Sequence, residues 1–302
     1  MGGPRTLVIG EALVDVIQRG ENKERRPGGS PANVAVGLAR LGQDVTLLCY
    51  LGQDDDGELL RSHMAAASVA LHPKSDRAPH TSIAEVELDQ TGNATYRFSV
   101  AWDLPPKLDW DAVDLAHVGS IALILEPGAS KLLQLLRDRP ERVRLTVDPN
   151  IRAAFLPSTR ATERFEQFFA VADIVKLSDE DADVLYPGRD IDEVVQRIRA
   201  IGPRLVVVTR GSRGAVLATA NERVEVAARA VQTIDTVGAG DSFMSALISA
   251  VVRLDSWEPG ASDLAVYGDW AVHAAAITVS REGADPPTES EMPTLDSPRS
   301  GS

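Results

Sequence analysis

The 302-residue sequence has a single cysteine, no long apolar run and no basic block. Cys49 alone can form neither an internal disulfide nor a cysteine metal cluster, and its apolar neighbours predict a buried thiol. A membrane span needs about 18 apolar residues, and the N-terminus lacks the features of a signal peptide, so we expect a cytoplasmic protein. The net charge of −13 argues against nucleic-acid or membrane partners.

The sequence also lacks a phosphate-binding G-x-x-x-x-G-K-[ST] loop. This absence disfavours the P-loop classes of nucleotide-binding protein. Because an acidic surface repels anions, any phosphate site must be built locally from backbone N–H groups, helix dipoles and metal ions.

Short β-branched runs alternate with helical patterns along most of the chain. Several of these runs have no polar alternation, which is typical of strands buried on both faces. The expected strands are residues 6–9, 45–50, 117–121, 143–148, 173–177 and 205–209. The expected helices are residues 31–41, 57–67, 127–137, 159–171, 191–200, 241–254 and 264–279. The alternation predicts βαβ crossovers, and therefore an α/β fold with a parallel sheet between two layers of helices.

One region departs from this alternation. Residues 81–88 and 94–100 alternate with period two around the polar segment 89–93. This pattern predicts a β-hairpin outside the main sheet.

The most informative segment is D-T-V-G-A-G-D-S-F at residues 235–243, ahead of an apolar helical stretch. The run Gly238-Ala239-Gly240 allows a tight turn whose N–H groups, with the helix dipole, suit a phosphate. A resting phosphate would repel Asp241, so this carboxylate needs a function, and a general base that deprotonates an attacking hydroxyl is one. The alternative is that Asp241 only caps the helix.

A second glycine-rich segment is P-G-G-S-P-A-N-V-A-V-G-L-A-R-L-G at residues 27–42. Gly28 and Gly29 permit close approach of a ligand to the backbone. Ser30 followed by proline predicts a helix N-cap, which places Asn33 in the first turn, aimed over the glycines. The alternative is a glycine turn before an ordinary helix with a surface asparagine.

Together the two segments resemble the signatures of the ribokinase-like (PfkB-type) carbohydrate kinases, the sugar-binding GG-x-x-x-N and the catalytic D-T-x-G-A-G-D. Further similar segments are D-P-N-I-R at 148–152, T-R-G-S-R-G at 209–214 and R-E-G-A at 281–284. The resemblance implies a three-layer ribokinase-like α/β fold with a small β-sheet lid. Its body would comprise residues 1–10, 27–74 and 104–288, and its lid would comprise residues 11–26 and 75–103. The polar composition of residues 289–302, with proline and serine, predicts a flexible tail there.

The resemblance also implies a set of sugar-site residues. Those expected to contact the sugar or reach the transferred phosphate are Asp15, Gly28, Gly29, Asn33, Arg97, Asn150 and Arg152. Asp15, at a strand end, would accept bonds from two sugar hydroxyls; the alternative is a solvated aspartate. Arg97 is equally compatible with an exposed lid arginine.

The nucleotide and cation sites follow from the resemblance in the same way. The ATP phosphates and ribose are expected to lie against Thr209, Gly211, Ser212 and Gly214, a segment that is also compatible with a plain hairpin turn. Where the family has an N-x-x-E element, this chain has Ser178-Asp179-Glu180-Asp181. Asp181 then takes the place of the glutamate, and we expect it to contact Mg²⁺ through a water molecule. Asp235 and Gly283 resemble a monovalent-cation site, so we expect K⁺ activation.

The implied function is an ATP-dependent sugar kinase with Mg²⁺, in which Asp241 deprotonates a primary hydroxyl and the Gly238-Ala239-Gly240 amides stabilise the transferred group. Residues 10–15, 94–98 and 283–287 look most like the fructokinase branch, which favours fructose. Ribokinase and 2-keto-3-deoxygluconate kinase are the alternatives, and a non-catalytic sugar or nucleotide sensor is an alternative of another class.

We also expect a homodimer joined through residues 81–100, because the edges of a small sheet are usually covered. The apolar positions of this surface are Val86, Leu88, Tyr96 and Phe98.

Overall fold

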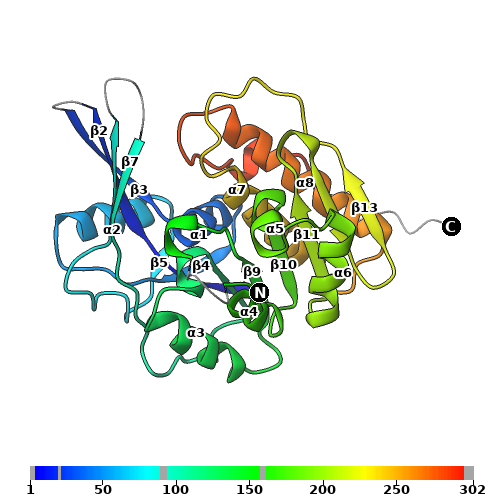
Figure 1. Cartoon of the computed structure of the whole chain (residues 1–302), viewed down its shortest axis with the longest axis horizontal. Helices are drawn as coiled ribbons and strands as arrows, with labels where there is room; N and C mark the ends of the chain where they lie inside the picture. The colour runs from blue at the N-terminus through cyan, green and yellow to red at the C-terminus, as the bar shows by residue number, and fades with distance from the viewer. Residues whose placement is uncertain (1–3, 20–21, 89–93, 157–160, 296–302) are drawn as a thin grey trace.

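A nine-stranded sheet forms the centre of the computed structural model, which describes residues 4–19, 22–88, 94–156 and 161–295 (Figure 1). The strand order is β13-β12-β11-β10-β9-β8-β1-β4-β5. Every pair from β5 to β11 is parallel, and β12 and β13 are antiparallel additions. The strands are β1 (Arg5–Ile9), β4 (Asp44–Leu48), β5 (Ala70–Leu71), β8 (Leu115–Gly119), β9 (Arg144–Asp148), β10 (Ile174–Ser178), β11 (Leu205–Thr209), β12 (Ala215–Ala218) and β13 (Arg223–Val226).

Helices cover both faces of this sheet, and each face has its own apolar core. On one face lie α1 (Ser30–Arg40), α2 (Asp55–Ala66), α7 (Ala239–Leu254) and α8 (Ala261–Val279). On the other face lie α3 (Gly128–Arg137), α4 (Ala161–Phe169), α5 (Asp179–Leu185) and α6 (Ile191–Ile201). Within β1, Val8 packs into the first core and Ile9 into the second, as the two-residue period of a strand requires. The predicted three-layer α/β body is confirmed.

A second, four-stranded sheet stands out from the body, at the upper left of Figure 1. Its order is β3-β2-β6-β7, from β2 (Leu13–Arg19), β3 (Asn22–Gly28), β6 (Ile83–Leu88) and β7 (Ala94–Ser99). The strands β6 and β7 pair antiparallel, so the expected hairpin and the small separate sheet are confirmed. The turn at 89–93 and the side chains of Val86, Leu88 and Tyr96 lie outside the described part of the chain.

Two helix starts differ from the sequence prediction. The N-cap of α1 is Gly29 and not Ser30, which becomes the first helical residue. The helix α7 begins at Ala239 after Gly238, whose left-handed φ of 76° suits glycine. Asp241 is therefore the third residue of α7 rather than its cap.

The segment expected to be a flexible tail from residue 289 begins with a 3₁₀ turn, η4 (Glu289–Glu291), that packs on the body. Arg253 pairs with Glu289, the Trp270 indole donates to the carbonyl of Pro293 at 3.1 Å, and Met292 is buried. The start of the predicted tail is thus wrong, because polar composition concealed these anchoring contacts. Residues 296–302 lie outside the described part.

Cys49 is fully buried, as its apolar neighbours predicted. None of the described helices has the length and hydropathy that crossing a membrane requires.

Candidate active site

The turn at residues 236–239, together with the first turn of α7, forms an exposed set of backbone donors, which we call the anion turn. No side chain of the described residues caps the start of this 16-residue helix. A Cβ on Gly238 would approach the Cα of Ala284 to 2.8 Å, so the turn packs directly against the loop after α8. The N–H groups of Val237 and Ala239 donate to Asp235 and to the carbonyl of Thr236, but those of Gly240 and Asp241 lie in the first turn of α7, where helix geometry supplies no i−4 acceptor. These two groups and the helix dipole favour an anion at this point.

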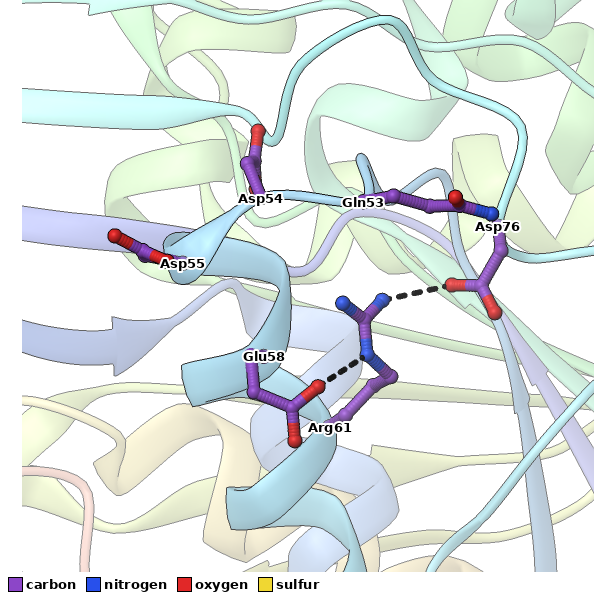
Figure 2. Close-up of a pocket in the computed structure, with 6 residues that line it drawn as sticks. All are labelled: Gln53, Asp54, Asp55, Glu58, Arg61 and Asp76. Atoms are coloured by element: carbon purple, nitrogen blue, oxygen red, sulfur yellow. Dashed lines mark hydrogen bonds and ion pairs between the residues drawn. The ribbon is translucent and has the colours of Figure 1, made fainter.

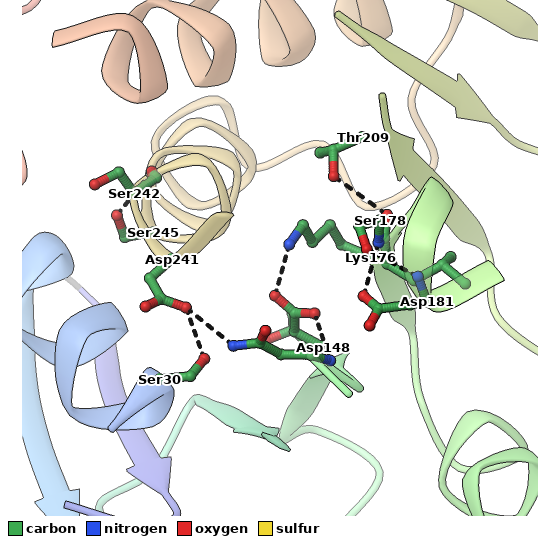
Figure 3. Close-up of polar contacts among 12 residues, drawn as sticks. Ser30, Asp148, Lys176, Ser178, Asp181, Thr209, Asp241, Ser242 and Ser245 are labelled. Atoms are coloured by element: carbon green, nitrogen blue, oxygen red, sulfur yellow. Dashed lines mark hydrogen bonds and ion pairs between the residues drawn. The ribbon is translucent and has the colours of Figure 1, made fainter. Parts of the chain in front are cut away.

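Asp241 is where the two sequence motifs meet. Its Oδ1 accepts a hydrogen bond from the hydroxyl of Ser30 at 2.6 Å (Figure 3). Its Oδ2 accepts one from the amide of Asn33 at 2.8 Å. The amide of Asn150, at the end of β9, reaches Oδ1 at 3.4 Å. These contacts bridge up to 211 residues of sequence, and they fix a buried carboxylate beside the anion turn.

Ser30 is a site residue that the sequence interpretation missed. It was expected to cap α1, a role that a hydroxyl at this position commonly has. Because Gly29 takes the cap position instead, the Ser30 hydroxyl is free to bind Asp241. The sequence held no sign of this shift by a single residue.

The glycines of the first motif lie against β2. A Cβ on Gly28 would lie 2.2 Å from Oδ2 of Asp15, so Asp15 projects over the glycine turn as expected. Gly29 has a φ of 104°, and a Cβ there would approach the carbonyl oxygen of Glu11 to 2.6 Å. Gly29 therefore requires glycine, whereas a side chain at Gly28 would force the Asp15 carboxylate to move.

A buried glutamate, a partly buried aspartate and an arginine lie at this end of the sheets. Burial raises the pKa of Asp15, and the charge of Arg152 opposes that rise. Burial also raises the pKa of Glu11 to about 7, although hydrogen bonds from the Ser120 side chain and the Ala122 N–H act to lower it. The guanidinium of Arg152 donates to Oδ1 of Asn150 at 2.8 Å, which links it to the Asp241 cluster.

Arg97 lies on β7 of the small sheet, opposite Glu85 of β6, and its side chain is exposed. The structure therefore places it on the lid and not within the Asp241 cluster. Its sugar contact remains a prediction.

The expected nucleotide segment forms the end of β11 and the hairpin to β12. Thr209 is the last residue of β11 and pairs in register with Ser178 of β10. Gly211 begins the short helix η3 (Gly211–Arg213), which includes Ser212, and Gly214 follows with a φ of 83°. A Cβ on Gly214 would lie 1.9 Å from the carbonyl oxygen of Val226. The segment is thus the hairpin turn between β11 and β12 that the sequence left open.

Asp181 joins two of the segments expected at the phosphate site. Its carboxylate accepts hydrogen bonds from the N–H of Ile151 at 2.8 Å and from the N–H of Ser178 at 2.9 Å. Ser178 caps α5, with its hydroxyl accepting from the N–H of Asp181 at 3.0 Å. This reciprocal capping box explains the helix α5 that the sequence interpretation omitted.

Asp235 and Gly283, the expected cation residues, are in direct contact. The Asp235 carboxylate accepts hydrogen bonds from the N–H of Val237 at 3.0 Å and the N–H of Gly283 at 2.9 Å. These two bonds, Val237 first, lower the pKa of Asp235. The contact ties the loop before α7 to the loop after α8.

A buried ion pair lies between Asp241 and Asp181, as Figure 3 shows. Lys176 of β10 donates to Oδ2 of Asp148, the last residue of β9, at 2.8 Å. The sequence interpretation named Asp148 only as the first residue of the D-P-N-I-R segment. It passed over Lys176, because a strand pattern does not reveal where a lysine side chain points.

A separate hollow opens at the start of α2 and is lined by Gln53, Asp54, Asp55, Glu58, Arg61 and Asp76 (Figure 2). Four of the six lining residues have structural partners: Asp54 accepts from the N–H of Gly57 and from Thr81, and Arg61 pairs with Glu58 and Asp76. Four carboxylates against one arginine do not suit an anionic nucleotide. The Asp241 cluster remains the candidate active site.

Comparison with known proteins agrees with this geometry. The chain matches the model of the pfkB family carbohydrate kinases over residues 5–291. The fructokinase of Klebsiella pneumoniae is 33% identical over 298 residues, which cover 92% of this chain and 94% of that protein. A double mutant of Vibrio cholerae O395 fructokinase, in a fructose, ADP and potassium ion bound form, has a TM-score of 0.80 at 29% identity, with 94% of each chain covered.

Aminoimidazole riboside kinase from Salmonella enterica has a TM-score of 0.78 at 26% identity, with 96% of each chain covered. The similar proteins thus include kinases of different sugars on one fold. The match spans both motifs and the junction at Asp241, and this chain belongs to the pfkB family of carbohydrate kinases.

Proposed function

We propose that this protein is an ATP-dependent fructokinase that phosphorylates a primary hydroxyl of the sugar. The observation that carries the proposal is the junction at Asp241, whose carboxylate binds Ser30 and Asn33 from the glycine motif. That carboxylate belongs to the first turn of α7, beside the anion turn. A sugar over Gly28 and Gly29 and a phosphate on the anion turn therefore share Asp241 as their common neighbour.

In this mechanism Asp241 accepts the proton of the sugar hydroxyl. The hydroxyl oxygen forms a bond to the γ-phosphorus, the bond from that phosphorus to the bridging oxygen breaks, and ADP leaves with the electron pair. The first-turn N–H groups of α7 stabilise charge on the transferring group. A carboxylate has about four lone-pair sites, and Ser30, Asn33 and Asn150 use three of them. One site is left for the incoming hydroxyl.

Mg²⁺ bound with ATP would neutralise charge on the phosphates. Asp181 fits a water-mediated contact, because each of its oxygens accepts one N–H and keeps lone pairs for water. Within the described ranges, no three Cys, His, Asp or Glu side chains converge as a metal site. That agrees with a cation held mainly by phosphates and water, as is usual for Mg²⁺.

For Asp235 and Gly283 we keep the assignment to a K⁺ site. The support is their direct contact beside the anion turn and the potassium ion named for the Vibrio cholerae relative. Activation of this protein by K⁺ stays a prediction.

The choice of fructose rests on the fructokinase-like segments at 10–15, 94–98 and 283–287 and on relatives that carry this name. Asp15, projecting over Gly28 and partly buried, contributes to specificity because such a carboxylate is left unpaired when a ligand lacks the matching hydroxyls. Ribose, 2-keto-3-deoxygluconate and nucleosides are the competing substrates. A non-catalytic sensor would have no need of a base held by Ser30 and Asn33.

The association and location of the enzyme also remain proposals. We propose a homodimer joined through residues 81–100 of the lid, and a cytoplasmic enzyme. The support for the dimer is the second sheet standing away from the body and the exposed ring of Phe98.

Steady-state kinetics with ATP and Mg²⁺ over fructose, ribose, 2-keto-3-deoxygluconate and nucleosides tests the proposal. We expect the highest kcat/KM with fructose. A higher kcat/KM with another compound on this panel would overturn fructose as the substrate and leave the assignment as a kinase in place. No phosphorylation of any of them would favour the sensor.

A further inference from the structure

We propose that Lys176 is a further catalytic residue, whose ammonium binds the γ-phosphoryl group of ATP at the anion turn while it keeps its hydrogen bond to Asp148. The inference deepens the proposed function and rests on it, since it concerns the phosphate side of the same site. It comes from the position of one buried lysine that neither sequence motif contains.

The position of Lys176 in the sheet is unusual for a charged residue. It lies on the parallel strand β10, which is flanked by β9 and β11, between the buried apolar residues Val175 and Leu177, with a relative exposure of 3%. Among the described residues it is the one lysine or arginine that is buried to this degree. A buried ion pair is weak support for a fold, because apolar residues of similar volume often do as well or better. The charge therefore points to a use other than stability.

The ammonium lies directly against the anion turn. A Cβ on Gly240, the second residue of α7, would lie 3.1 Å from Nζ of Lys176. Glycine at this position leaves the space between the ammonium and the helix start open. A lysine ammonium has three N–H donors, and within the described part of the chain only Asp148 accepts one of them. Two donors remain for a ligand on the turn.

The surrounding carboxylates keep this lysine charged. Burial acts to lower the pKa of Lys176, but Asp148, Asp181 and Asp241 outweigh it and raise that pKa above the ordinary value. The three carboxylates alone would repel a phosphoryl group. Lys176 supplies positive charge in their midst, where a low local dielectric strengthens its interaction with an anion.

Asp148 holds Lys176 and the base cluster in a fixed relation. Its Oδ2 accepts from Lys176 at 2.8 Å and its Oδ1 accepts from the N–H of Asn150 at 3.2 Å. Asn150 has a left-handed φ of 34°, and its amide donates to Asp241 at 3.4 Å. The chain from Lys176 through Asp148 and Asn150 thus ends on the proposed base.

In the resulting step, the proton of the sugar hydroxyl goes to Asp241, and the hydroxyl oxygen forms the new bond to the γ-phosphorus. The bond to the bridging oxygen of ADP breaks, and its electron pair stays on ADP. Lys176 gives up no proton and forms no covalent bond. It donates hydrogen bonds to the γ-phosphoryl oxygens and offsets their negative charge. In the cluster of described residues around Asp241, it is the positively charged side chain that lies against the anion turn.

The test compares binding of ADP with binding of β,γ-imido-ATP, both with Mg²⁺, by calorimetry. The variants are Lys176→Met and the double variant Lys176→Met with Asp148→Asn, which leaves no buried carboxylate unpaired. Lys131→Met, which breaks an exposed lysine–aspartate pair with Asp103, is the matched control. Melting temperatures establish that each variant is folded.

We expect both Lys176 variants to lose about tenfold or more in affinity for β,γ-imido-ATP, while their affinity for ADP stays nearly unchanged. We also expect kcat to fall about 100-fold, as when one preorganised hydrogen-bond donor is removed. The control should match the wild type. A purely structural role would weaken both nucleotides together, so an unchanged preference for β,γ-imido-ATP over ADP in a folded double variant would overturn the inference.

A double variant that does not fold would also overturn it, because the pair would then be a requirement of the fold. These outcomes are separate from failure of the proposed function. That failure would appear in the wild type, as absence of nucleotide binding or of sugar phosphorylation.

Discussion

At the scale of single residues, the site depends on a few side chains that backbone geometry brings together. Asp241 could be predicted as a candidate base from its motif, and Asn33 as a sugar-site residue by resemblance, though not the hydrogen bond that joins them. Ser30 and Lys176 could not, because the first depends on a cap position displaced by one residue and the second on the direction of a side chain within a sheet. Sequence patterns specify residue types more reliably than the atoms those residues meet.

Glu11 gives a prediction about pH. Burial raises its pKa from 4.5 to about 7, so the folded protein binds this proton more tightly than the unfolded chain. The contribution of Glu11 to stability is therefore greatest below about pH 4.5 and is lost as the pH rises to about 7. Glu11→Gln removes this dependence, and we expect it to be more stable than the wild type by roughly 1–3 kcal/mol at about pH 8.

Urea unfolding at several pH values from 5 to 8 measures this difference. Substitution of the exposed Glu141 by glutamine is the control and should leave the wild-type pH dependence in place. Parallel curves for Glu11→Gln and the wild type would show that Glu11 is not the titrating group.

At the scale of elements, apolar periodicity predicted six of the nine body strands and most helices to within a few residues, but not β5, β12 and β13. It missed β3, whose sequence N-K-E-R-R-P-G has no apolar alternation and which pairs along its length with β2. It missed α5, because the capping box of Ser178 and Asp181 occupies the segment assigned to metal binding. In both cases polar interactions decide the structure: strand pairing with β2 forms β3, and a local capping box forms α5. Apolar periodicity cannot predict interactions of this kind.

The pairing of β2 with β3 places Asp15 over Gly28, and this gives a second prediction. In Gly28→Ala the new Cβ would lie 2.2 Å from the Asp15 carboxylate, so that side chain must move. We expect KM for the sugar to rise about tenfold or more, since charged hydrogen bonds of this kind are worth about 1.5–3 kcal/mol. KM for ATP should change little.

Steady-state kinetics with each substrate varied in turn separates the two effects. Gly260→Ala is the matched control, because a Cβ there meets no atom within 4 Å. Equal changes in the two KM values for Gly28→Ala would argue that Asp15 does not face the sugar.

At the scale of the whole molecule, the small sheet is joined to the body beside the active site. On β7, the ring of Phe98 packs against the ring of Phe155, which follows the D-P-N-I-R segment, with 4.8 Å between the ring centroids. Phe98 nevertheless remains 39% exposed. A sheet with an exposed aromatic ring and open edges is usually covered by a partner. This arrangement supports the lid both as a cover for the sugar and as a contact surface.

We predict a dimer through this lid. Light scattering over a dilution series should give the dimer mass in the micromolar range, and Val86→Lys with Phe98→Lys should give the monomer, because buried charges without partners are costly. A monomer mass for the wild type throughout would end the proposal, and a dimer that persists in the double variant would move the interface elsewhere.

The central claim is that Asp241 takes the hydroxyl proton at the junction of the two motifs. The most direct measurement is turnover of Asp241→Asn, with ATP and sugar binding measured on the same preparation and Asp255→Asn, at the other end of α7, as the control. We predict a loss of about 10²–10⁴ in kcat, as for removal of a general base, with both ligands still bound. An Asp241→Asn enzyme that keeps more than about a tenth of wild-type turnover, far above what loss of the base allows, would contradict the account.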